Sequence, residues 1–378
     1  MGEHYWVKFP EKVTSQYFYR ELLPEVMDYY QKSEFISKDM LFNWGDVDFI
    51  NALVIPNILM LGHQMRILTG KKIIIYIPTV FELLQYLDDI NFLSFARRFQ
   101  IYDFYEDYIG GYNATPSVNR KSYYISNKYT IAEIWRVLGE SDKVIKASFR
   151  DNCETVEGIV ADKIKKELWE ICKNSLEHAN SFSFVTIQKE CSINKVMIST
   201  SDTGIGMYDA LKKKILLEKE EAKRDSSYIE KQQLHFMEND TFLKLDNKKD
   251  KELYAIFEAV FYRWEEQKED DNIIGDLSCS NGLWYLINET LKRNEGTVRI
   301  HSNDYRLVFT KRLFSEVIDL NVLKSIYTTF EEQELRNNEK YDSELFFTII
   351  ANVKKTANAK QYKYTYSGVH IEVEAKLN

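Results

Sequence analysis

The residues with the clearest chemical potential lie close together in the segment ELWEICKNSLEHA. Glu170, Asn174, Glu177 and His178 fall within about a third of the circumference of a helix, at about 100° per residue. One face therefore carries two carboxylates, an amide and an imidazole, whereas the opposite face is apolar or small. Because the polar face of an amphipathic helix is most often simply solvated, this face predicts a site only with further support.

The sequence that follows provides that support. Apolar stretches at 181–188 and 196–200 predict two strands, and the second leads to Asp202, Gly204 and Gly206 in the turn DTGIG. Such a turn alone is weak evidence, since Asp and Gly are common in turns for conformational reasons. A polar helix, two strands and a glycine turn in this order are more specific, and they indicate a site for the phosphates and base of a nucleotide.

These motifs resemble those of the GHKL superfamily of ATP-binding domains, which includes gyrase-type topoisomerases, heat-shock chaperones, mismatch-repair ATPases, histidine kinases and anti-sigma-factor serine kinases. The segments that carry the resemblance are Glu170 to Asn174, Asp202 to Gly206, Ser280-Asn281-Gly282-Leu283, the strand at 296–302 and the closing strand at 366–373. They occur in the order that the family shows.

The resemblance implies a role for each motif. Asn174 would hold Mg²⁺ through its side-chain oxygen, and Glu170 would orient or deprotonate the attacking water. Asp202 would accept a hydrogen bond from the adenine amino group. Gly204, Gly206 and Gly282 would let the backbone approach the base and phosphates, and the helix that follows would favour the anion. The remaining contacts implied for the nucleotide are those of Ser280, Asn281, Leu283, Ser367 and His178.

Three departures from the family pattern concern these same loops. Ser280 replaces a glycine of the third motif, and Trp284 follows Leu283 where histidine kinases often have another glycine. Val369 replaces the threonine that helps to hold adenine, a loss that Ser367 would offset. The changes predict slower turnover rather than lost binding, because the candidate base and metal ligand are both retained.

Two histidines require separate interpretation. His178 is interpreted as a supporting hydrogen-bonding group, which is the commoner role of a histidine near a helix end. His63, in LGHQMR, lacks the acidic residue and proline that follow a phospho-accepting histidine. No paired coiled-coil helix surrounds it, so the sequence does not indicate a sensor histidine kinase.

The N-terminal third carries a second resemblance, to STAS-type domains. A strand at Asp48-Phe49-Ile50, an amphipathic helix from about 52 to 68, the strand KIIIYIP and a further helix give a βαβα pattern with a parallel sheet. The loop that can hold a phosphorylated Ser or Thr in this family offers Asn51 and Ala52, with no hydroxyl between Val47 and Met60. This domain is therefore expected to pack on the ATPase domain or bind a partner, without a phospho-switch at that position.

Composition narrows the functional classes. The net charge of −8 argues against nucleic acid as the main ligand, and no run of about 18 apolar residues predicts a membrane span. The four cysteines show no metal-ligand spacing, and the start of the chain has no signal-peptide pattern. Together these features predict a soluble, cytoplasmic protein, and the abundance of lysine, asparagine and tyrosine suggests a bacterial source.

The expected architecture combines α/β and α+β elements in two domains. Residues 1–150 form the STAS-like domain and a connector, and residues 151–378 form a GHKL α/β sandwich. Helical insertions are expected at about 207–279, where histidine kinases have a short lid, and at about 312–360. Aromatic residues at helical spacing in both insertions indicate either core or a docking surface, and core is the commoner of the two.

The resulting prediction is a Mg²⁺- and ATP-binding protein that hydrolyses ATP slowly as a conformational switch for a protein partner. One alternative is a protein serine/threonine kinase of the anti-sigma-factor kind, in which Glu170 activates a hydroxyl of the partner. Another is a non-catalytic nucleotide-binding scaffold. Dimers are common in the superfamily, although the sequence contains no swapped arm or heptad seam that would specify a homodimer.

Overall fold

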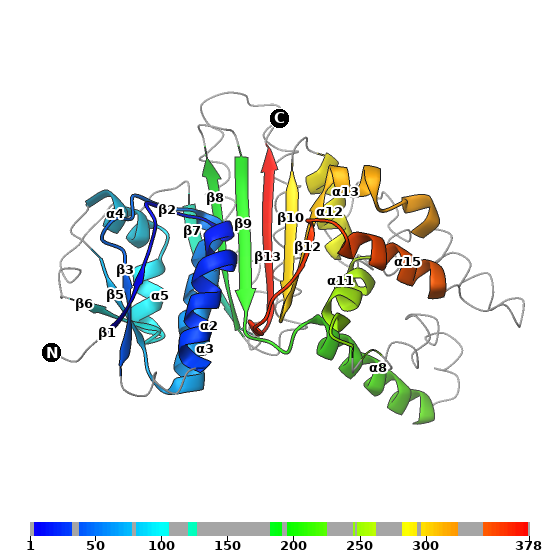
Figure 1. Ribbon diagram of the computed structural model, residues 1–378, viewed down its shortest axis with the longest axis horizontal. Coiled ribbons are helices and arrows are strands. Elements are labelled where there is room, and N and C mark those ends of the chain that lie inside the picture. The colour runs from blue at the N-terminus through cyan, green and yellow to red at the C-terminus, as the bar shows by residue number, and fades with distance from the viewer. Residues whose placement is uncertain are drawn as a thin grey trace, which may run out of the picture.

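The protein is a mixed α/β structure built around two main sheets. A computed structural model describes residues 4–31, 38–77, 81–105, 120–126, 182–190, 195–224, 245, 248–261, 282–292, 296–323 and 343–376. These residues form a four-stranded sheet, a seven-stranded sheet and a two-stranded sheet. Figure 1 shows the resulting layers, with the small sheet at the left, N-terminal helices next to it, the large sheet in the centre and further helices at the right.

The small sheet is entirely parallel, as the sequence predicts. Its strands, in spatial order, are β1 (His4–Lys8), β3 (Asp39–Asn43), β5 (Ile73–Tyr76) and β6 (Tyr102–Tyr105). The strand predicted at Asp48–Ile50 lies elsewhere: it is β4 (Phe49–Ile50), which pairs with β2 (Lys12–Val13) in the two-stranded sheet. The chain turns sharply after β3, where the Asn43 side chain accepts a hydrogen bond from Gly45 N at 2.9 Å. In the four-stranded sheet, β3 pairs with β1 and β5.

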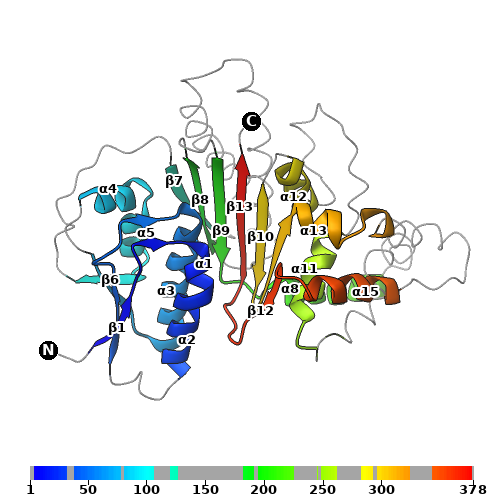
Figure 2. The same cartoon turned by 45° about the horizontal axis from the view of Figure 1, so that its top comes forward.

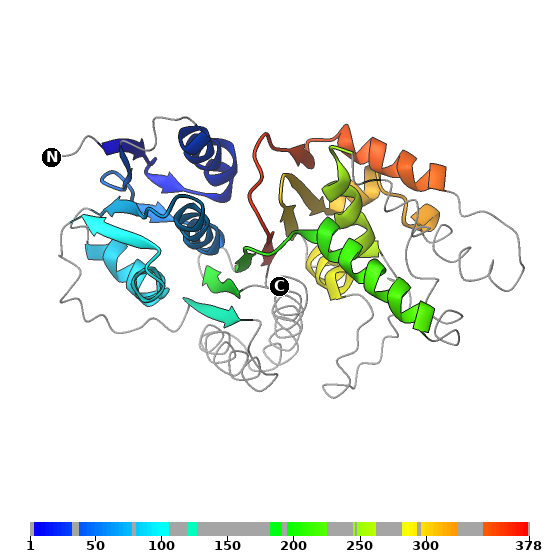
Figure 3. The same ribbon diagram turned by 90° about the horizontal axis from the view of Figure 1, so that it is seen from below.

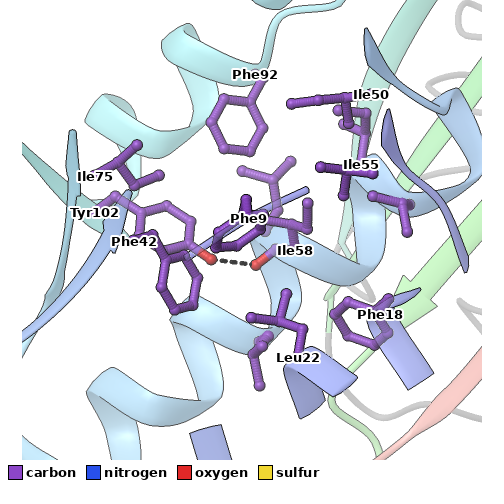
Figure 4. Close-up of a cluster of buried hydrophobic side chains, with 14 of the residues drawn as sticks. Phe9, Phe18, Leu22, Phe42, Ile50, Ile55, Ile58, Ile75, Phe92 and Tyr102 are labelled. Carbon is purple, nitrogen blue, oxygen red and sulfur yellow. Dashed lines mark hydrogen bonds between the residues drawn. The ribbon is translucent and has the colours of Figure 1, made fainter. Parts of the chain in front are cut away.

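The helices of the N-terminal part lie mainly between the two sheets (Figure 1). They are α1 (Ser15–Tyr17), the π-helix η1 (Phe18–Leu22), α2 (Leu23–Gln31), the 3₁₀-helix η3 (Ala52–Val54), α3 (Ile55–Thr69), α4 (Phe81–Asp89) and α5 (Phe92–Arg98). Figure 4 shows their shared core, where the Tyr102 hydroxyl donates to the carbonyl oxygen of Ile58 among Phe9, Phe42 and other apolar side chains.

Local sequence accounts for both ends of the η3–α3 segment. The Asn51 side chain accepts a hydrogen bond from Leu53 N at 2.9 Å, and Pro56 lies in the first turn of α3. Gly70 ends the helix in the left-handed conformation, with φ 72°. Asn51 therefore caps a helix.

Helix α3 differs from the prediction in one important respect, because it is not amphipathic. It contacts β5 of the small sheet on one side and β8 and β9 of the large sheet on the other. Even Asn57 and Gln64 are buried, and only the last turn, with Ile67 and Leu68, is well exposed. A helix enclosed between two sheets needs polar residues where its polar partners lie rather than along one solvated face.

The large sheet is entirely antiparallel, and Figure 2 shows most of its strands side by side. Its spatial order is β12-β11-β10-β13-β9-β8-β7. The strands are β7 (Arg120–Ser126), β8 (Phe182–Glu190), β9 (Lys195–Asp202), β10 (Thr297–Ser302), β11 (Tyr305–Thr310), β12 (Ala359–Gln361) and β13 (Val369–Lys376). The strands predicted near 181–188, 196–200, 296–302 and 366–373 are confirmed as β8, β9, β10 and β13, and β13 lies at the centre of the sheet.

Edge strand β7 begins at Arg120, within the stretch that the sequence indicated as a connector. It pairs along its whole length with β8, from Arg120 opposite Gln188 to Ser126 opposite Phe182. The large sheet therefore takes its first strand from upstream of residue 150, where the domain boundary was expected.

The two faces of the large sheet are covered by different parts of the chain. Along β9, Ser199 and Ser201 face the N-terminal helices, whereas Val196 and Ile198 belong to the core on the other side. The helices on that second side are α8 (Met207–Arg224), α11 (Lys251–Phe261), α12 (Gly282–Lys292), α13 (Lys311–Glu316) and α15 (Ser343–Lys354). Seen from below in Figure 3, the N-terminal unit and these helices lie on opposite sides of the sheet.

Both helical insertions contribute to the core. Tyr254, Phe257, Val260 and Phe261 of α11 are buried at the helical spacing seen in the sequence, whereas Trp264 lies outside the described residues. In the second insertion, α15 matches the helix expected at 343–355. α13 overlaps only the start of the helix expected at 314–333, and residues 324–333 lie outside the described residues. The aromatic residues of α11 are therefore part of the core and do not form a docking surface.

None of the helices within the described part of the chain is long and apolar enough to cross a membrane.

Candidate functional site

Asp202 ends strand β9 as a buried carboxylate that is partly held by backbone groups. Its Oδ1 accepts hydrogen bonds from Gly204 N at 2.8 Å and from Val369 N at 3.1 Å. Only 3% of the residue is exposed. No described residue donates a hydrogen bond to Oδ2, so this oxygen retains its capacity to accept one.

Two glycines with positive φ allow the chain to close around this carboxylate. Gly368 has φ 100°, and a Cβ atom there would lie 2.1 Å from the backbone oxygen of Asp202. Gly206 has φ 82°, and its Cβ would lie 2.1 Å from Nδ2 of Asn303. The close contact at Gly368 brings the start of β13 against the end of β9, and that at Gly206 brings the turn against the Asn303 side chain.

A buried polar network fixes the turn after Asp202. The Ser302 hydroxyl donates to Glu252 Oε2, and Asn303 Nδ2 donates to Glu252 Oε1 at 2.8 Å. Asn303 Nδ2 also donates to the carbonyl oxygen of Ile205 at 3.1 Å, while Met207 N donates to Ser302 Oγ at 2.8 Å. Glu252, on inserted helix α11, therefore anchors the glycine turn through the β10–β11 hairpin.

The same network occupies the N-terminus of α8. The backbone N–H of Met207 donates to Ser302 Oγ, and that of Tyr208 donates to Glu252 Oε2 at 3.3 Å. These two amide groups are consequently directed at protein partners and are not available to bind the phosphates of a ligand.

Burial is the main influence on the Asp202 carboxyl group. It raises the pKa of Asp202 to about 7, although the hydrogen bonds from Gly204 and Val369 oppose this rise. At neutral pH the carboxyl group is therefore poised between its two protonation states. A ligand amino group at Oδ2 would favour the ionised state.

A pH dependence of stability follows from this pKa. Since the pKa in the folded state lies above the ordinary value of 3.8, Asp202 contributes most to stability at acidic pH, and this contribution is lost as pH rises to about 7. We expect the unfolding free energy of the wild type, relative to Asp202→Asn, to fall by up to about 4 kcal/mol between about pH 4 and about pH 8. Urea denaturation of both proteins across this range measures the difference, and a constant difference would contradict it.

The third motif leads directly into α12, which begins at Gly282. Leu283 is buried in the core shared by the C-terminal helices. The Trp284 ring lies 5.5 Å from the ring of Phe261 and 5.9 Å from that of Phe314. Trp284, a departure from the family pattern, therefore packs between residues of the two insertions, and its bulk is accommodated in the core.

Several predicted site residues lie outside the described part of the chain. They are Glu170, Asn174, Glu177, His178, Ser280 and Asn281. The structure therefore brings together Asp202, Gly204, Gly206 and the start of β13, with Ser367 adjacent to Gly368. Within the ranges that the structure describes, no three His, Cys, Asp or Glu side chains are grouped so that they could hold a metal ion.

Helix α3 reaches the same strand ends from the opposite face of the sheet. Asn57 Nδ2 donates to Glu372 Oε1 at 2.9 Å, and Asn57 Oδ1 accepts from the Ser201 hydroxyl. Gln64 Nε2 donates to the carbonyl oxygen of Ser367 at 2.7 Å. Two polar side chains of the N-terminal unit thus bind the residues next to Asp202 and Gly368.

Replacing Asn57 should be costly, because it would leave the buried Glu372 carboxylate without its amide donor. We expect Asn57→Ala to lower the unfolding free energy by about 2–4 kcal/mol, measured by urea denaturation. Asn51→Ala removes an asparagine that only caps a helix, and should cost about 1 kcal/mol. Equal losses in the two variants would contradict the role given to Asn57.

Several contributors to the site were not predicted from the sequence. Asn303 and Asp304 form a tight hairpin turn whose residue types are typical of turns, so the turn itself could have been anticipated. Glu252 lies in a charged run at 248–252 that gives no sign of a buried carboxylate. Its role depends on the position of α11 in the folded protein.

Comparison with known proteins gave no match, whether to protein-family models, to curated proteins or to solved structures.

Proposed function

We propose that this chain binds Mg·ATP at the end of β9, hydrolyses it slowly and uses it as a conformational switch for a protein partner. The observation that carries the proposal is the Asp202 carboxylate, buried at a strand end with Oδ1 held by two backbone N–H groups and with no described residue donating to Oδ2. An adenine amino group is a donor of the kind that this oxygen accepts.

The other components are assigned through the sequence motifs. Asn174 would hold Mg²⁺ together with phosphate oxygens of the nucleotide, as a hard cation requires. Glu170 would orient or deprotonate the attacking water. The N-terminus of α12, after Gly282, would favour the phosphate charge.

Contacts between the two units support the use of nucleotide as a switch. Asn57 and Gln64 of α3 bind Ser201 and Ser367, each next to a residue that builds the Asp202 site. A change at the strand ends would therefore alter hydrogen bonds to the N-terminal unit. A partner that binds this unit could respond to the nucleotide without touching it.

The decisive experiment follows γ-labelled ATP incubated with Mg²⁺ and the purified protein. Glu170→Ala, Asn174→Ala and Asp202→Asn are assayed in parallel, with nucleotide binding measured separately. Release of labelled phosphate by the wild type, with loss in the first two variants and weaker binding in the third, is the expected result. Label that stays in bound ATP would favour a kinase awaiting its protein substrate or a non-catalytic scaffold, and absence of binding would overturn the proposal.

A further inference from the structure

Two positively charged residues lie directly opposite each other near the edge of the large sheet. Arg306 of β11 is the register partner of Lys360 of β12, so the two side chains share one face of an antiparallel pair. Like charges in this arrangement repel each other and destabilise the pairing of the strands. Lys360 is exposed and Arg306 is half-buried, so solvent screens only part of this repulsion.

A third cation approaches the same place from the N-terminal unit. Arg20, on η1, lies close enough that its charge, after burial and the charge of Arg306, lowers the pKa of Lys360. No Asp or Glu of the described chain forms an ion pair with any of the three. Glu372 is a buried carboxylate that Asn57 binds and that lies 3.8 Å from Arg299; burial raises its pKa, and the charges of Arg299 and Arg306 oppose this rise.

Aromatic rings form the floor of this cluster. The Arg306 guanidinium lies 5.0 Å from the centre of the Tyr19 ring and 5.9 Å from that of Tyr362, and Lys360 Nζ lies 4.7 Å from the Tyr362 ring. Cation–π attraction holds the two cations over the rings. It supplies no oxygen acceptor for their N–H groups and no net negative charge to offset the repulsion.

Two polar atoms at this floor are buried without a partner. Within the part of the chain that the structure describes, the Tyr362 hydroxyl makes no hydrogen bond although only 8% of the residue is exposed, and the buried Arg306 Nε likewise has no partner. Unsatisfied buried donors are costly, so native proteins rarely retain them without a ligand or another compensating group. These two buried atoms lie beside three cations that form no ion pair with a described residue. They are a second, independent indication of a ligand.

We propose that Arg20, Arg306, Lys360 and Tyr362 form a binding site for a phosphate-bearing anion. The negative charge of a phosphate group would offset the repulsion between Arg306 and Lys360. Its oxygens can accept hydrogen bonds from guanidinium, ammonium and hydroxyl donors. Arg306 lies over two rings that already orient it, which lowers the entropic cost of binding.

The site is separate from the proposed nucleotide site. Arg306 lies in one cross-sheet row with His301, His370 and Ser201, on the face that contacts the N-terminal unit. Asp202, the next residue after Ser201, points to the opposite face of β9. An anion bound at Arg306 would therefore act as a second ligand, next to the junction of the two units.

The test measures thermal unfolding and titration calorimetry of the full chain with inorganic phosphate and with pyrophosphate, at an ionic strength held constant with potassium chloride. Wild-type protein should unfold several degrees higher with either anion, and Lys360→Gln should bind at least about 10-fold more weakly. Without anion, Lys360→Gln should be as stable as the wild type or more stable, because the repulsion is gone. If Lys360 only stabilised the fold, Lys360→Gln would instead be less stable than the wild type without anion.

Matched variants make the outcome decisive. Lys311→Gln makes the same charge change at the start of α13 and should respond as the wild type does. Tyr362→Phe should weaken binding, and Asp202→Asn should retain it. A wild type that responds to neither anion, or a Lys360→Gln variant that responds fully, would overturn the proposal. Tighter binding of pyrophosphate would identify a polyphosphate ligand, and tighter binding of phosphate a monophosphate.

Discussion

Asp202→Asn is expected to weaken ATP binding by about 10- to 100-fold and to abolish the preference for ATP over GTP. The substitution keeps an oxygen that can accept from Gly204 N and Val369 N. It replaces Oδ2 by an NH₂ group, which would face the adenine amino group as donor against donor. Guanine presents a carbonyl oxygen at the equivalent position, so the wild type should reject GTP and the variant should not.

Calorimetric titration of ATP and GTP into both proteins measures this change. ATP affinity of the wild type should also rise with pH up to about 7, since the ionised carboxyl group is the better acceptor and burial raises the pKa of Asp202 to about 7. The variant should show no such rise. Asp209→Asn, in the first turn of α8, serves as a control with the same charge change. Unchanged selectivity in Asp202→Asn would place adenine elsewhere.

Gly368→Ala is expected to destabilise the protein by about 3 kcal/mol or more. A Cβ atom at this position would lie 2.1 Å from a backbone oxygen of Asp202, and φ of 100° is unfavourable for any residue with a side chain. A backbone atom cannot turn aside as the end of a side chain can, so β13 must shift away from β9. Since Val369 N binds Asp202, this shift should also weaken nucleotide binding.

Gly70→Ala provides the matched control for this prediction. Gly70 has a similar positive φ of 72°, but a Cβ atom there would meet no other atom within 4 Å. Its replacement should cost only about 1 kcal/mol, the penalty of the left-handed conformation. Urea denaturation separates the two contributions, and equal losses would show that the clash at Gly368 relaxes at little cost.

The parts of the fold that could be predicted from the sequence are those with a local cause. Apolar stretches predicted β8 and β9, the resemblance to the GHKL family suggested β13, and Gly70 and Asn51 mark the ends of the η3–α3 segment. The turn at Asp202 was likewise visible, because glycine is needed where the backbone must come close. Such signals depend on residues near each other in the chain.

The remainder depends on contacts between distant segments. The sequence predicted that α3 is amphipathic, yet its polar residues Asn57 and Gln64 bind Glu372 and Ser367, which lie far away in the sequence. In the sequence, Glu252 is indistinguishable from a surface charge. Its burial follows from the packing of α11 against the β10–β11 hairpin. Composition and periodicity carry no information about which partner will cover a polar group, so these contributors could not be found in advance.

The central position of β13 has a consequence for how the protein is made. β13 pairs with β9 on one side and β10 on the other, yet it is the last of the seven strands to be synthesised. Until it emerges, β9 and β10 each present an unpaired edge, and the segment that carries Asp202 lacks its bond from Val369. Nascent chains are therefore expected to be most vulnerable to aggregation in this interval, and the glycine turn can reach its final form only after the sheet is closed.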